Sequence, residues 1–312
     1  MRKLLTLTCA LMLVSSMAFA KRYPASAGKT PADLVPFPDA GKGWVTLDIG
    51  SKSNVFKPTE EPRVKARNTS VTPSFIYAFN SNIAATFDIG FVSGKTLNVQ
   101  GNDKNKISGV TNPTFGVVYR VLDSAKNNND LNIGLSISPT IGKKVVKQKV
   151  DRNQENAVSG NNVIDFNVAW AKNISSFAVG AEFGITYIGQ QKVKTKFNDG
   201  SETDRYKPNS NFNLGINAQY KGVNKLALTT GIDYTNYGKK TLRGRAGAAN
   251  TVIHKGFGQL SFAFDANYNV CKNTYVAVNW NHAFKATVKD GNSVKQGKVS
   301  SDAFGIGATY QF

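Results

Sequence analysis

Strict alternation between apolar residues and polar or small residues recurs along most of this chain. Residues 212–220 are the clearest example, with Phe, Leu, Ile, Ala and Tyr separated by Asn, Gly, Asn and Gln. A strand turns successive side chains to opposite faces, whereas a helix would scatter these apolar residues around its axis. Residues 115–121 and 131–138 repeat the pattern. The chain is therefore predicted to be all β, with strands that have one apolar and one polar face.

About 12 such segments follow one another, and the connections between them alternate between short and long. A transmembrane barrel has this organisation, with an even number of strands, short periplasmic turns and long external loops. A secreted β-sandwich would have shorter strands and no two-length rhythm. The predicted strands are 44–51, 70–79, 83–92, 110–122, 131–142, 161–171, 176–189, 209–221, 225–236, 256–270, 274–285 and 301–312.

The requirements of lipid make closure of this sheet a further prediction. Every backbone donor and acceptor in hydrocarbon must be paired within the protein, so the first strand should pair with the last. Aromatic residues near the strand ends would form girdles at the two membrane interfaces. The predicted fold class is a transmembrane antiparallel up-and-down β-barrel over residues 44–312.

Both ends of the chain carry features typical of export to the outer membrane of a Gram-negative bacterium. Residues 1–20 have a basic start, an apolar run and a small-x-small end, which predicts a signal peptide. Residues 21–43, rich in Pro, Ala and Gly, are predicted to be a loose periplasmic extension, with a plug in the bore as the alternative. The alternating C-terminus ends at Phe312 and resembles the signal that the barrel-assembly machinery recognises.

One stretch resembles a known family. Residues 109–120 fit the pattern G-x-x-[DN]-P-x-x-G-x-x-Y-R, and the strand at 131–138 leads into Pro-Thr-Ile-Gly. The pattern, followed by a strand that ends in Pro-Thr-Gly, resembles the MetA-pathway phenol-degradation outer-membrane protein family. Asn112 replaces the commoner Asp, and Ile141 interrupts the Pro-Thr-Gly. The resemblance implies a channel for small, often aromatic, compounds.

Positive charge is concentrated in the predicted long connections. The formal net charge is +19. Basic runs commonly bind nucleic acid, but an exported barrel rarely meets that partner, so none is expected. The two remaining interpretations are a cationic mouth that attracts acidic solutes, and contact with lipopolysaccharide phosphates together with loop solubility. The basic residues selected are Lys143, Lys144, Lys147, Lys149, Arg152, Lys239, Lys240, Arg243, Arg245 and Lys255.

The inward face has the opposite sign. Asp165 and Glu182 are equally distant from a predicted turn at 172–175, so they are expected to face each other directly, where like charges repel. A raised pKa, a neighbouring cation or a metal ion would have to compensate. The hypotheses are an acidic constriction that favours cations or amines, and plain screening by water and loop lysines. The residues predicted to line the lumen are Asp48, Asp88, Arg120, Asp165, Glu182, Asp233 and Asp265.

Residues for enzymatic chemistry are few. His254 and His282 are the candidate bases, and neither has a recognisable nucleophile beside it. Two histidines and Cys271, at scattered positions, do not make a metal site. We therefore predict a passive channel for small hydrophilic or aromatic solutes, without catalytic residues, metal or cofactor. The alternatives are a non-transporting surface barrel whose basic loops act in adhesion or lipopolysaccharide contact, and a lipid-modifying outer-membrane enzyme.

Overall fold

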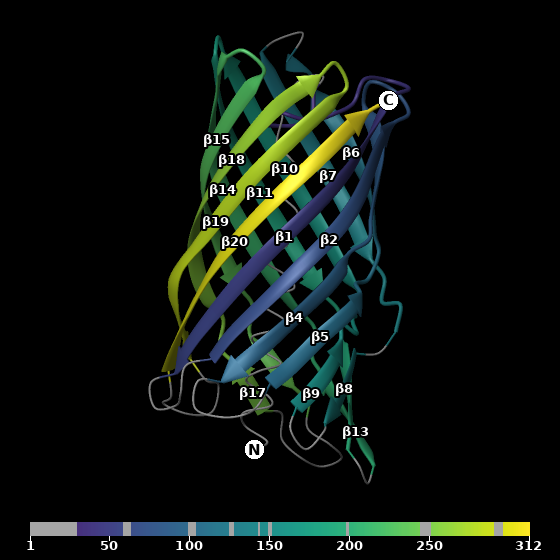
Figure 1. Ribbon diagram of the computed structural model, residues 1–312, viewed down its shortest axis with the longest axis vertical. Helices are drawn as coiled ribbons and strands as arrows, with labels where there is room; N and C mark the ends of the chain where they lie inside the picture. The colour runs from purple at the N-terminus through teal and green to yellow at the C-terminus, as the bar shows by residue number, and fades with distance from the viewer. Residues whose placement is uncertain are drawn as a thin grey trace.

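The computed structural model describes residues 30–58, 64–98, 104–124, 128–142, 144–148, 152–197, 200–243, 251–289 and 296–312. The signal peptide predicted at 1–20 lies outside these residues. The described chain is all β and forms a closed antiparallel barrel of 12 strands, as predicted (Figure 1). The described residues include no helix that is long and apolar enough to cross a membrane.

The barrel strands follow chain order, and many are divided by a short break. They are β1 (Gly43–Pro58), β2 (Val64–Ala78), β3 (Ile83–Asp88) with β4 (Phe91–Asn98), β5 (Lys104–Val110) with β6 (Thr114–Leu122), β7 (Asn129–Ser138), β10 (Val163–Ile174), β11 (Phe177–Ile188) with β12 (Gln191–Lys196), β13 (Ser201–Tyr206) with β14 (Asn209–Val223), β15 (Leu226–Tyr237) with β16 (Lys240–Leu242), β17 (Thr251–His254) with β18 (Phe257–Cys271), β19 (Thr274–Lys289) and β20 (Gln296–Gln311).

The first and last strands pair along their full length. Antiparallel partners run from Trp44 opposite Gln311 to Pro58 opposite Gly297. This pairing leaves the sheet without an open edge, which is what a strand surrounded by lipid requires. The prediction of closure is confirmed.

The short connections lie at one end of the barrel, together with Gly43, where β1 begins, and the C-terminus. We call this the turn end, and it is uppermost in Figure 1. The opposite end, the loop end, carries the long connections. Strands reach further toward the loop end than the sequence predicted. The predicted loop at 52–69 is mostly strand, because β1 continues to Pro58 and β2 begins at Val64.

At the loop end, the two strands of one hairpin lie in the wall in the reverse of the order that their chain connections would give. It consists of β8 (Lys144–Gln148) and β9 (Arg152–Asn156), which follow β7 and precede β10. β9 runs parallel to β5 and β8 runs parallel to β12, so the two connecting segments must cross. Gly160 lies at the crossing with a φ of +74°, and an added Cβ would be 2.6 Å from the backbone oxygen of Lys192. Only glycine fits this position without strain.

Asn112, from the Asn-Pro motif, stabilises this crossing. Its Nδ2 donates hydrogen bonds to Ser159 Oγ at 2.7 Å and to the backbone oxygen of Asn161 at 3.1 Å. These bonds join the chain between β5 and β6 directly to the segment that precedes β10. The motif therefore has a structural role in the wall of the barrel.

The outward face is apolar at mid-height. Leu214, Ile216 and Ile306 are exposed, with Ile216 at 62%. An apolar belt of this extent would be unfavourable against water and is suited to lipid. Aromatic side chains lie outward near the strand ends, as predicted for interfacial girdles; exposed examples are Phe79, Tyr119, Tyr187, Tyr268 and Tyr310.

Two adjacent residues of β14 test which face meets lipid. Ile216 points outward and Asn217 points into the barrel. We expect Ile216→Arg to lower the free energy of unfolding by about 2–4 kcal/mol, because it places a charge at the lipid midplane. Asn217→Arg adds the same charge on the other face and should have a much smaller effect. Urea unfolding in lipid vesicles, followed by tryptophan fluorescence, measures both, and equal losses would contradict the assignment.

Candidate functional site: the barrel lumen

Residues 30–42 lie inside the turn end of the barrel. Leu34, Val35 and Phe37 are only 2%, 3% and 0% exposed. Leu34 and Val35 pack on the inward alanines of β10 and β11, and Phe37 packs on inward residues of β2, β3 and β6. For these residues the alternative of a plug is therefore the one observed, and the expectation of a loose segment is wrong. Burial of these three apolar side chains is the physical reason.

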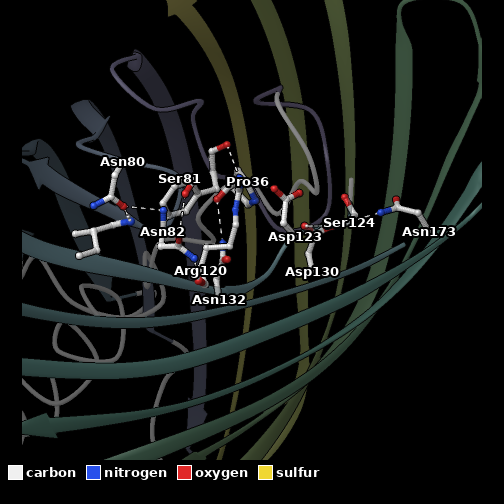
Figure 2. A network of polar contacts seen from close by, with 12 residues as sticks. Pro36, Asn80, Ser81, Asn82, Arg120, Asp123, Ser124, Asp130, Asn132 and Asn173 are labelled. Atoms are coloured by element: carbon white, nitrogen blue, oxygen red, sulfur yellow. Dashed lines mark hydrogen bonds and ion pairs between the residues drawn. The ribbon is translucent and has the colours of Figure 1, made fainter. Parts of the chain in front are cut away.

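Polar contacts hold this plug at several points (Figure 2). Arg120 Nη2 donates a 2.9 Å hydrogen bond to the backbone oxygen of Phe37, and the guanidinium lies 4.1 Å from the centre of the Phe37 ring. Asn132 Nδ2 donates to the backbone oxygen of Pro36 at 3.2 Å. Arg120 does face the lumen, as predicted, and the structure adds that it anchors the plug.

Two further anchors lie on β14. Gln219 Nε2 donates a 2.8 Å hydrogen bond to the backbone oxygen of Ala32. Lys221 forms an ion pair with Asp33. Together with Arg120 on β6 and Asn132 on β7, these contacts fix the plug to two separate parts of the wall.

On the loop-end side of the plug, the inner wall carries inward glycines that alternate with amide side chains, and this keeps the wall flat. The Asn167 side chain lies over Gly134, and the Asn213 side chain lies over Gly184. In both pairs the two residues are direct neighbours on adjacent strands. An Asn or Asp covers an inward glycine in the same way at Asn217 and Gly231, Asn279 and Gly305, and Asp48 and Gly307. The amide side chains therefore lie along the wall, over the neighbouring glycines.

All six predicted acidic residues point inward by strand alternation. Asp88 and Asp233 are buried, whereas Asp48, Asp165, Glu182 and Asp265 keep part of their surface accessible. The inward placement agrees with the prediction, and selectivity at these residues remains a proposal.

The predicted face-to-face contact of Asp165 and Glu182 is wrong. Asp165 lies opposite Thr186, whose Oγ1 donates to it at 2.6 Å, and Glu182 lies opposite Ala169. The turn is formed by residues 175–176, about two residues later than expected, and this changes the register. The nearest acidic neighbour of Glu182 is on the other side, where Glu182 and Asp233 both reach over Gly215.

An apolar arc lines the inner face near the loop end. Its members are direct or near neighbours across adjacent strands, such as Phe56 beside Val64 and Val299. The Tyr237 and Phe257 rings stack with their centroids 4.8 Å apart. A second buried cluster, built on β8, β12, β13 and β17, continues the apolar lining. The arc consists of Phe56, Val64, Tyr237, Phe257, Ala286 and Val299.

The predicted mouth cations divide into exposed and buried groups. Lys147, Lys239, Arg243 and Lys255 are exposed, as expected. Lys144 is buried and pairs with buried Glu155 at 3.2 Å, and Lys240 lies 4.3 Å from the centre of the Tyr206 ring. For these two lysines the expected open loop position is wrong, because they lie on strands. Arg152 belongs to β9, while Lys143, Lys149 and Arg245 lie outside the described residues.

The two histidines lie in different surroundings. His254 is buried against Phe257, and this burial lowers its pKa, an effect to which nearby Lys240 contributes. His282 faces outward between aromatic rings and contacts Asp302 at 2.7 Å. No group of three His, Cys, Asp or Glu side chains within the described ranges is placed to hold a metal ion.

Comparison with known proteins supports the fold. No protein-family model matches the chain, and no curated protein matches it, so the resemblance to the phenol-degradation family is not confirmed. The fold is similar to that of the COG4313 outer membrane channel from Pseudomonas putida F1, with a TM-score of 0.63 and 13% identity over 91% of this chain and 100% of that chain. It is also similar to the translocator domain of the autotransporter NalP from Neisseria meningitidis, with a TM-score of 0.56 and 12% identity over 97% and 94% of the two chains.

Proposed function

We propose that this chain is a passive outer-membrane channel for small solutes, with the loop end outside the cell and the turn end in the periplasm. The closed sheet and the apolar outward belt support a barrel that spans a membrane. Short turns at one end and long connections at the other support the orientation.

The observation that carries the channel proposal is the accessible surface at mid-lumen. Asp48, Asp165, Glu182 and Asp265 are partly accessible although they point inward. The apolar arc lies on their loop-end side and the plug lies on their turn-end side, and both consist of buried side chains. This arrangement supports a chamber between the plug, which closes the turn end, and the apolar arc, which lines part of the wall near the loop end. A small pocket lies between the plug and the wall and is lined by Leu34 and Glu182 among others.

The lining of this path favours a small aromatic solute with a positive charge. A solute from the loop end would pass the apolar arc, where the buried Tyr237 and Phe257 rings would have to separate and could then stack on an aromatic ring. It then meets the carboxylates of the chamber, which attract cations. Movement would be diffusion down a gradient, and release to the periplasm would need the plug to shift.

Flux into proteoliposomes tests this solute class. Phenyltrimethylammonium and benzenesulfonate are aromatic ions of similar size and opposite permanent charge, so neither crosses the bilayer readily by itself. We expect the cation to enter several-fold faster than the anion, and faster than tetramethylammonium, which lacks the ring. Faster entry of benzenesulfonate would contradict the acidic chamber, and entry no faster than into empty liposomes would favour the non-transporting surface barrel.

A further inference from the structure

The outward faces of β1, β2, β4 and β5 carry three successive rows of side chains, which we call the graded patch. Each row consists of direct cross-strand partners, and each is two residues nearer the loop end than the last. The first row is apolar, the second carries hydroxyl groups and the third is mainly cationic. The rows are Ile49, Val71, Phe91 and Val110; then Ser51, Thr69, Ser93 and Ser108; then Ser53, Arg67, Lys95 and Lys106.

The cationic row is an unusual arrangement for a folded sheet. Arg67, Lys95 and Lys106 are all exposed and occupy neighbouring strands, which lie about 4.8 Å apart. Like charges placed directly opposite each other are destabilising. Within the described residues these three side chains make no ion pair, and the outward faces of β1, β2, β4 and β5 carry no Asp or Glu there. A bound anion would remove this repulsion.

More basic residues surround the row. Lys65 is half-buried on the same face of β2 as Arg67, and it lies two residues nearer the loop end. Lys104 and Arg152 occupy paired backbone positions at the start of β5 and β9. Lys65 therefore adds one more cation on the loop-end side of the row, away from the apolar belt.

The order of the rows matches the order of groups in an anionic membrane lipid. Two residues of a strand advance about 6.7 Å, so the cationic row is about 13 Å along the strands from the apolar row. Barrel strands tilt by about 35–45°, so this offset is about 10 Å along the membrane normal, which would place the cations at the depth of lipid headgroups when the apolar row lies near the edge of the hydrocarbon. Arginine and lysine together are a common donor set for phosphate, with arginine able to bind two oxygens at once.

We propose that the graded patch binds a phosphorylated glycolipid of the outer leaflet. Its phosphate lies against Arg67, Lys95 and Lys106, its sugar hydroxyls face the Ser and Thr row, and its acyl chains cover the apolar row. The site is on the strands, apart from the predicted loop lysines. It rests on the proposed orientation, with the loop end outside the cell, but not on transport through the lumen.

The chain provides a matched control on another part of the wall. Lys192 and Arg205 are exposed direct neighbours on β12 and β13. The strand breaks at 189–190 and 207–208 separate them from the apolar belt, so no continuous graded rows lead to them. Arg67→Gln/Lys95→Gln and Lys192→Gln/Arg205→Gln each remove one arginine and one lysine.

Native mass spectrometry of the full chain in detergent, with diphosphoryl lipid A as the probe, measures the binding. We expect Arg67→Gln/Lys95→Gln to weaken lipid A binding about tenfold or more, since it removes two charge-assisted contacts to the phosphate. The Lys192→Gln/Arg205→Gln control should bind like the wild type. Removal of the phosphates from lipid A should weaken its binding to the wild type. The loss should equal the loss that Arg67→Gln/Lys95→Gln causes with diphosphoryl lipid A.

Folding and non-specific binding are checked in the same samples. Heat-modifiable mobility on a gel reports the folded barrel, and Arg67→Lys/Lys95→Arg, which keeps both charges, should retain binding. Equal loss in the two double variants would overturn the proposal in favour of general charge attraction. Displacement of lipid A by an equal concentration of inorganic phosphate would overturn it in favour of a free-anion site.

Discussion

Removal of residues 30–40 is expected to raise the time-averaged current through the barrel by more than about a hundredfold in planar bilayers. In the intact protein, Leu34, Val35 and Phe37 are buried at the turn end and four wall residues hold the segment. Each buried apolar side chain contributes about 1.5–3 kcal/mol, so a displaced plug is rare. The intact channel should therefore show brief, infrequent openings, and the shortened chain should show a sustained current.

A single substitution at the anchor should give an intermediate result. Arg120→Ala removes a charge-assisted hydrogen bond and the contact with the Phe37 ring. A loss of about 2 kcal/mol corresponds to roughly thirtyfold more frequent opening. Lys272→Ala, at an exposed turn of the same end, is the control and should leave the openings unchanged. A folded barrel that stays silent after removal of the plug would contradict this account.

Neutralising the chamber is expected to abolish cation preference. In the background without residues 30–40, the barrel should show a reversal potential of cation-selective sign in a salt gradient. Asp48→Asn/Asp165→Asn/Glu182→Gln/Asp265→Asn should move this potential close to zero, because these partly accessible carboxylates supply the fixed charge at mid-lumen. Asp302→Asn removes an outward carboxylate and should leave the potential unchanged. The effect should diminish at high salt, since mobile ions screen fixed charges.

The opposite outcomes are equally clear. An anion preference in the starting channel would show that basic groups control the path. An unchanged potential after the quadruple substitution would show that the chamber carboxylates do not act on permeating ions. Either result would remove the acidic chamber from the proposed function.

The number of strands and the direction of the lumen side chains could be predicted, because both follow from the alternation of successive side chains between the two faces of a strand. In β14, the alternation from Phe212 to Tyr220 assigns each residue to a face without knowledge of any partner strand. The inward direction of Asp48, Asp165 and Glu182 follows from the same alternation. Closure followed from the physics of lipid, and pairing of β1 with β20 agrees with it.

Register was harder to predict, because it depends on the position of each turn. The segment from Lys172 to Ser176 is polar apart from Ile174 and contains no glycine. The turn is formed by Ser175 and Ser176, with Ser175 at a φ of 55°, a conformation for which Ser is not a typical choice. A two-residue error in the turn was enough to pair Asp165 with the wrong residue.

The extended loop-end strands and the plug had weaker signals. In β12 and β13 the outward residues are Lys, Arg, Ser and Thr, so the apolar face that identifies a strand is missing. The plug sequence Leu-Val-Pro-Phe-Pro is apolar but has no period. Its partners, such as Arg120 and Gln219, are remote in sequence. Their roles therefore became visible only in the structure.

The most direct measurement of the central claim is the current through a barrel whose lumen is filled. Gly184→Trp/Gly231→Trp, in the background without residues 30–40, puts two large side chains over the amide-lined wall of the chamber. If solutes pass through this lumen, the folded variant should lose most of its single-channel conductance. An unchanged conductance in correctly folded protein would contradict the assignment of the barrel interior as the path.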